Sequence, residues 1–240
     1  MYYSPAMTRP TLKKQPFNAE AKRRLKRPAA FSDADMERIE TQIILFNAAK
    51  NNVMDTFERM PRDKQLRVMD MQNTKDGFSP LMNACMNGHS AVADHLVKLG
   101  AKTELRDHDG RTALNHATAR GSLPIISILL DAGVDIDTPD NVGCTPLMTA
   151  VLRKNYPVVS LLLERGCDLN AGNVTGSTAL ELAQNNGATA IAALITDIAK
   201  SRHLQAELSG IQQGLAGDLT VSRPLTLKKP VLKKPRARRL

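Results

Sequence analysis

The sequence predicts an all-α solenoid of stacked helix pairs, joined by short β-hairpin or turn fingers and flanked by disordered basic tails. Two observations predict the solenoid: one pattern recurs four times at a spacing of 33 residues between Thr74 and Ile198, and the apolar residues of each copy follow helical spacing. A single copy has no second layer over its apolar faces, so the copies must stack on one another.

The repeat is visible as columns of equivalent residues. So many positions stay in register that chance similarity is excluded, and a fixed period of this length is typical of repeat architectures. Three of the columns are Gly77, Gly110, Gly143 and Gly176; Leu81, Leu114, Leu147 and Leu180; and Ala84, Ala117, Ala150 and Ala183.

Each copy has the residues that begin and end two helices. A turn glycine such as Gly110 supplies a positive φ, and Thr112, two residues later, is a candidate helix cap. In the third copy Pro146 follows the cap at the first helical position, where its missing N–H does no harm. Gly121 and Gly133 are placed to end the two helices of the second copy.

These residues resemble the ankyrin repeat. The family's pattern of Gly, one residue, then Thr-Pro-Leu occurs at residues 143–147, and its Gly-His pair occurs as Gly88 and His89. Its ending, three leucines and then Gly-Ala-Asp-Val-Asn, is similar to residues 161–163 and 166–170. The resemblance covers about half of the chain, and it implies a binding role toward other proteins.

The sequence departs from the family's pattern at several positions. Where the family has a histidine after the first leucine, this chain has Met82, Asn115, Met148 and Glu181, so we expect a turn-stabilising hydrogen bond to be lost. The glycine between the two helices is Lys154 in the third copy. We expect lower local stability and an unchanged fold.

Atypical units are expected at both ends, because their outer faces meet water. Ser32 is a candidate cap for a degenerate first unit with an insertion near residues 61–64, and the last helix is expected to run to about Leu208. The predicted organisation is a tail at 1–31, a capping repeat at 32–73, repeats at 74–106, 107–139 and 140–172, a capping repeat and helix at 173–209, and a tail at 210–240.

Composition limits the cellular setting. The three cysteines are odd in number and unevenly spaced, which argues against a secreted disulfide framework. No charged region followed by an apolar run opens the chain, and no segment has the apolar length of a membrane span. We therefore expect an intracellular, cytoplasmic monomer.

No residue pattern supports catalysis. Cys85 and His89 have a ligand-like spacing of four, but Gly88 breaks the helix between them and His89 has a structural place in the repeat. Cys144 and Cys167 lack a basic neighbour in the sequence that would form a thiolate. We expect neither an enzyme nor a cofactor or metal site.

The concave face of the solenoid is the predicted binding surface, and its partner is another protein. Large apolar and arginine side chains there are the expected anchors, although Phe78, Met86 and Leu152 could instead pack between neighbouring turns. The residues placed on this face are Lys75, Asp76, Phe78, Met86, Asn87, His108, Arg111, Ala119, Arg120, Asn141, Val142, Cys144, Leu152 and Arg153.

The net charge of +9 resides in the two ends, because residues 36–200 carry an excess of acidic groups. Two alternatives follow: the tails bind nucleic acid with steep salt dependence, or they direct the protein to a nucleus. Few aromatic residues are interleaved for base stacking. The residues concerned are Lys22, Arg23, Arg24, Lys26, Arg27, Lys233, Lys234, Arg236, Arg238 and Arg239.

Overall fold

The computed structural model describes residues 32–220, with side chains described as far as Ser209. This part of the chain consists of helices that are joined by short turns. The helices are α2 (Asp33–Asn51), α3 (Met54–Arg59), α4 (Arg62–Val68), α5 (Pro80–Asn87), α6 (Ser90–Leu99), α7 (Ala113–Arg120), α8 (Leu123–Asp131), α9 (Pro146–Leu152), α10 (Tyr156–Glu164), α11 (Ala179–Asn185) and α12 (Thr189–Thr220).

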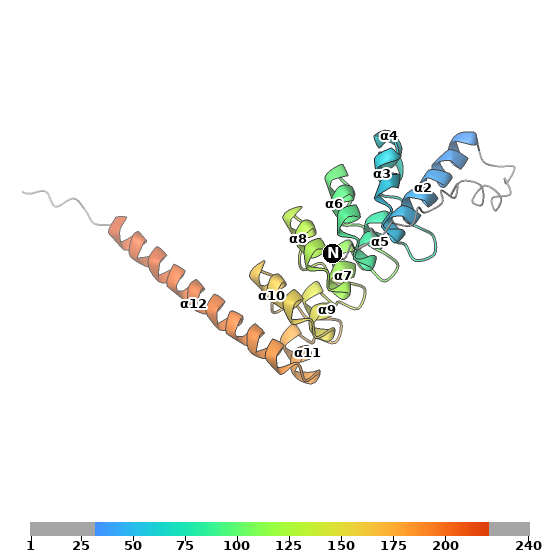
Figure 1. Cartoon of the computed structure of the whole chain (residues 1–240). Coiled ribbons are helices and arrows are strands. Elements are labelled where there is room, and N and C mark those ends of the chain that lie inside the picture. The colour runs from blue at the N-terminus through green and yellow to red at the C-terminus, as the bar shows by residue number, and fades with distance from the viewer. Residues whose placement is uncertain (1–31, 221–240) are drawn as a thin grey trace, which may run out of the picture.

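The helices form two rows. The first helices α5, α7, α9 and α11 pack side by side, and the second helices α6, α8, α10 and the start of α12 form the other row (Figure 1). The stack curves, with the first helices on its inner side (Figure 1). The predicted all-α solenoid is confirmed.

One core runs through the stack, because the repeating apolar columns are buried. Leu81, Leu114 and Leu147 of the first helices are at most 1% exposed. Ile125 and Val158 of the second helices are fully buried. The small alanines of the first helices are equally buried, so neighbouring helices can approach closely.

The fingers are hydrogen-bonded turns. In the described part of the chain, β-structure is confined to an isolated bridge between Gly172 and Thr178. Consecutive finger tips are joined by their backbones: Asn141 donates its N–H to the carbonyl of Asp109 at 2.9 Å, and its side-chain amide donates to the carbonyl of His108 at 3.0 Å. The tips therefore form a continuous edge along the concave side.

Two of the departures from the family's pattern restore the hydrogen bond that we expected to be lost. The Asn115 side-chain oxygen accepts from the N–H and hydroxyl of Thr112, at 3.1 and 2.6 Å. The Glu181 carboxylate accepts from the N–H of Thr178 at 2.9 Å. Both form a capping box, so the expected loss is wrong in these two units.

Lys154 adopts the left-handed conformation, with φ of +53°. The equivalent positions in the two preceding units are Gly88 and Gly121, with φ near +80°. A side chain in this region is strained, because its Cβ approaches the following carbonyl. The third unit keeps the family's backbone at a local cost.

The N-terminal unit is built differently from the others. Ser32 caps α2, whose Asp35 N–H donates to the Ser32 hydroxyl at 3.2 Å. Pro61 separates α3 from α4, and this break lies where the sequence analysis places an insertion, near residues 61–64. The Gln65 amide holds the two short helices together by donating to the carbonyls of Phe57 and Met60, at 2.6 and 2.8 Å.

The last helix is longer than expected. α12 continues to Thr220, past Leu208 and past Gly210, where we had placed the start of the tail. A glycine costs a helix only about 1 kcal/mol, which the alanine, leucine and glutamine residues of this segment partly offset through their helix propensity. The remainder of the two predicted tails, residues 1–31 and 221–240, lies outside the described residues.

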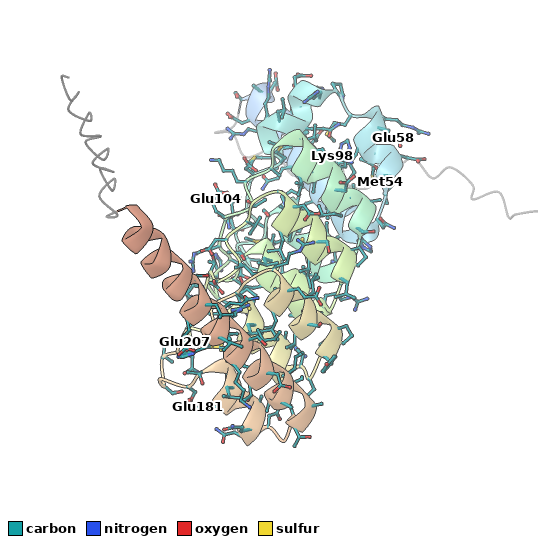
Figure 2. The ribbon with its side chains drawn as sticks, turned by 90° about the vertical axis from the view of Figure 1, so that its left-hand side faces the viewer. Met54, Glu58, Lys98, Glu104, Glu181 and Glu207 are labelled. Atoms are coloured by element: carbon teal, nitrogen blue, oxygen red, sulfur yellow. The ribbon has the colours of Figure 1, made fainter. Side chains whose placement is uncertain are left out.

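The two edges of the stack differ. Figure 2 shows Glu104 on the edge formed by the fingers, Glu58 of α3 on the opposite edge, and Lys98 on the outer helix α6.

Over residues 32–220, no helix combines the length and the apolar character needed to cross a membrane.

Candidate functional site

A groove opens on the concave side between α7 and α9. It encloses a cavity of about 250 Å3 at the level of the third finger. Its walls are Arg111, Asn115 and Ala119 on one side, and Asp140, Val142, Cys144, Thr149, Leu152 and Arg153 on the other.

The finger that forms one wall is held by Asp140. One carboxylate oxygen of Asp140 accepts from the N–H groups of Val142 and Cys144, at 3.1 and 2.8 Å. The Asp140 side chain is only 7% exposed, so its role is to fix the turn. A small polar side chain that accepts from its own turn is a common way to stabilise such loops.

Arg111 stands at the opposite wall and remains about half exposed. Its guanidinium lies 3.5 Å from Asp109 and 3.7 Å from Asp140. Both separations exceed hydrogen-bonding distance. The two carboxylates orient Arg111 and leave its N–H groups able to bind another acceptor.

Apolar side chains lie beside these charges. Val142 is 54% exposed and Leu152 is 48% exposed. Arg153, the C-cap residue that follows α9, is exposed next to Leu152. The Arg153 side chain forms no hydrogen bond or ion pair with another described residue. The groove thus combines exposed apolar surface with an unpaired positive charge.

The groove has no activated nucleophile. Burial, with the nearby Asp140 carboxylate, raises the pKa of the Cys144 thiol above its usual range. Burial also raises the pKa of Cys85, and it raises the pKa of Cys167 to about 12. All three thiols therefore stay protonated at neutral pH, which removes the thiolate that nucleophilic chemistry needs.

Cys85 and His89, which are four residues apart in the sequence, have structural roles. Cys85 is fully buried, and the His89 ring bonds to the carbonyl of Lys50 at 2.9 Å. His116 forms a buried pair with Asp107, at 2.8 Å. Within the described residues, no three His, Cys, Asp or Glu side chains cluster as metal ligands would.

The structure brings six of the residues predicted for the concave face together, Ala119 among them. Arg111, Leu152 and Arg153 line the groove, with the neighbouring Val142 and Cys144. The others lie along the same face. Lys75, His108 and Asn141 are exposed on the finger tips, Met86 and Arg120 are exposed at the ends of α5 and α7, and Asn87 is half-buried.

Phe78 is occupied within the protein. Its ring packs edge-on against the ring of His116, with 4.9 Å between the centroids, and it contacts the core. Phe78 thus packs within the protein, as the alternative expectation had it, and it does not line the groove. Met86 and Leu152 are exposed instead.

Three lining residues were missing from the prediction: Asn115, Asp140 and Thr149. Helical spacing held a signal for two of them. Asn115 precedes the predicted Ala119 by four residues, and Thr149 precedes Leu152 by three, so each pair shares one helix face. Asp140 is a turn residue whose position depends on the folded finger.

Two other cavities flank α2. One of about 350 Å3 lies between Ile43 and Phe46 of α2 and residues 71–74. Another of about 470 Å3 lies between α2 and α4, where Lys64 already pairs with Glu37 at 2.6 Å. The groove between α7 and α9 is smaller, but it lies among first helices and finger tips, where the binding residues were predicted.

The basic residues assigned to the tails, in segments 22–27 and 233–239, lie outside the described residues. Nucleic-acid binding or nuclear targeting through them stays a prediction.

Comparison with known families gives a consistent result. A model described as ankyrin repeats (3 copies) matches residues 45–140, and a model described as ankyrin repeats (many copies) matches residues 119–183. The two matches together span more than half of the chain. No curated protein matches it.

Proposed function

Because the chain belongs to the ankyrin repeat family, we propose that it is a non-enzymatic module, an adaptor, scaffold or effector, that binds a partner protein on its concave face. Ankyrin repeats are general protein–protein interaction modules. The partner contacts the groove between α7 and α9 and the finger tips beside it.

The observation that carries this proposal is the exposure of Leu152. A leucine 48% exposed at the end of a first helix contributes little to the core. It lies beside Val142 and two arginines in a groove of about 250 Å3. Clustered apolar and arginine side chains are typical of the residues that dominate binding energy.

Affinity capture with variant proteins tests the proposal. Leu152→Asp places a charge in the groove without disturbing the buried core, and we expect it to abolish capture of proteins that the unaltered chain retains. Leu204→Asp is the matched control, because Leu204 is also an exposed leucine, at 58%, but lies on α12. Equal capture by all three proteins would refute the concave face as the binding surface.

A further inference from the structure

The charges in the groove indicate the chemistry of its partner. Arg111 and Arg153 are exposed, whereas the one carboxylate in the lining, Asp140, is buried and already accepts two backbone N–H groups. Asp109, which lies outside the lining, and Asp140 both lie within ion-pairing distance of Arg111, at 3.5 and 3.7 Å, so among the described residues Arg153 carries the charge without a carboxylate partner. A ligand in the groove therefore meets positive charge and backbone that is already hydrogen-bonded.

An apolar strip runs beside these arginines. It consists of Val142, Leu152 and Val174, and Val174 on the next finger tip is 71% exposed. The backbone N–H of Val174 donates to the carbonyl of Val142 at 3.2 Å, which holds the two finger tips together. The first two fingers present Lys75, Asp76, His108 and Asp109 at the equivalent positions. Exposed apolar finger tips are thus specific to this end of the face.

The size of the groove limits the form of the ligand. Pockets for drug-sized molecules measure about 300–1,000 Å3, and this cavity is smaller, at about 250 Å3. It accommodates side chains of a segment that extends beyond it along the finger tips. The chain's own terminal segments are basic, so their charge does not complement the arginines of the groove.

We propose, on the basis of the function proposed above, that the groove binds an extended acidic segment of the partner protein. One apolar side chain of the segment lies against Val142 and Leu152. Flanking carboxylates accept from Arg111 and Arg153, in bonds that are stronger than those between neutral groups. Nucleic acid would satisfy the arginines, but the apolar strip has no aromatic ring on which bases stack.

Selection from a displayed library of random dodecapeptides, with the full chain as bait, tests this chemistry. We expect the enriched peptides to carry net negative charge and at least one Leu, Ile, Met or Phe. Arg111→Gln with Arg153→Gln should weaken binding of a fluorescein-labelled enriched peptide at least about tenfold, which corresponds to about 1.4 kcal/mol. Lys102→Gln with Lys200→Gln removes the same charge outside the groove and should leave binding within about twofold.

Arg153→Glu serves as a second variant, because the Arg153 side chain has no hydrogen bond or ion pair with another described residue and its replacement should not unfold the protein. Three outcomes would each overturn the inference: enrichment of neutral or basic peptides, absence of any enriched peptide, or equal binding of the peptide by all variants. Displacement of the peptide by single-stranded RNA from the unaltered protein, but not from the arginine variants, would also overturn it. Loss of protein capture in Leu152→Asp alongside any of these outcomes would leave the proposed function standing.

Discussion

Arg202 on α12 donates a hydrogen bond of 2.6 Å from its guanidinium to the backbone carbonyl of Cys167, just beyond the end of α10. A second bond of 2.7 Å reaches the carbonyl of Leu163. The last carbonyls of a helix lack partners within the helix and carry partial negative charge. Arg202 donates to the Cys167 carbonyl and adds a second donor to the Leu163 carbonyl, which also accepts from the Gly166 N–H. These bonds attach the long last helix to the repeat before it.

Arg202→Ala should therefore lower the free energy of unfolding by about 1–2 kcal/mol, since bonds from a charged donor are lost and two half-buried carbonyls lose a partner. Urea denaturation measures the change. Lys200→Ala is the control, because Lys200 is exposed on the same helix. Equal effects of the two substitutions would show that the attachment of α12 does not depend on Arg202.

Lys154→Gly should stabilise the protein by about 0.5–1 kcal/mol, because glycine adopts the left-handed conformation of this position without strain. The reciprocal change, Gly121→Ala, should destabilise it. Alanine is strained at the positive φ of this position, and its Cβ would lie 2.5 Å from the side-chain amide nitrogen of Asn155. Thermal unfolding of both variants gives the comparison, and a lower melting temperature for Lys154→Gly would contradict the assignment of strain.

Thr118→Val should also stabilise the protein, by about 1 kcal/mol. The Thr118 hydroxyl is fully buried and has no hydrogen-bond partner, which leaves its desolvation uncompensated. The same position is Cys85 in the first repeat and Val151 in the third, so the site accepts apolar side chains.

Thr112→Val is the matched control for Thr118→Val. The Thr112 hydroxyl bonds Asn115 at 2.6 Å and caps α7, so this variant should lose about 1 kcal/mol. Chemical denaturation that ranks the two variants in the opposite order would refute the assignment of the buried hydroxyl as unsatisfied.

The buried pair of His116 and Asp107 gives the fold a dependence on pH. Burial lowers the pKa of His116 below its usual value of about 6.5, and the hydrogen bond to Asp107 opposes this only in part. The unfolded chain therefore takes up a proton, as pH falls below about 6.5, that the folded chain resists. Stability is full above that pH and declines as pH falls from about 6.5 toward the lower folded pKa.

Urea denaturation between pH 5 and 8 measures this decline. His116→Asn should flatten the profile over that range while lowering stability at pH 8, since the bond to Asp107 is altered. Asparagine occupies the equivalent position, Asn83, in the first repeat. An unchanged slope in the variant would assign the pH dependence to other groups.

The sequence specified the repeated part of the fold because its signals are local and recur. Gly110 marks a turn and Thr112 a cap whichever unit contains them, and the same spacing placed Arg111, Leu152 and Arg153 on one face. A capping side chain could also be exchanged without loss, as Asn115 shows by taking the histidine's place.

Features that depend on distant partners were not accessible in this way. Arg202 lies 35 residues from Cys167, and nothing in the periodicity of α12 distinguishes it from other exposed cations. The packing of Phe78 depends on His116 in the next repeat. The end of α12 was misplaced because glycine propensity is a weak predictor where neighbouring residues favour a helix.

Site-specific photo-crosslinking tests most directly whether a partner protein contacts the groove between α7 and α9. A benzophenone side chain at position 142 lies in the groove, and one at position 98 lies on the outer helix α6 (Figure 2). We predict a crosslinked partner at 142 that is absent at 98. Crosslinking at 98 alone, or equal crosslinking at both positions, would contradict contact at the groove.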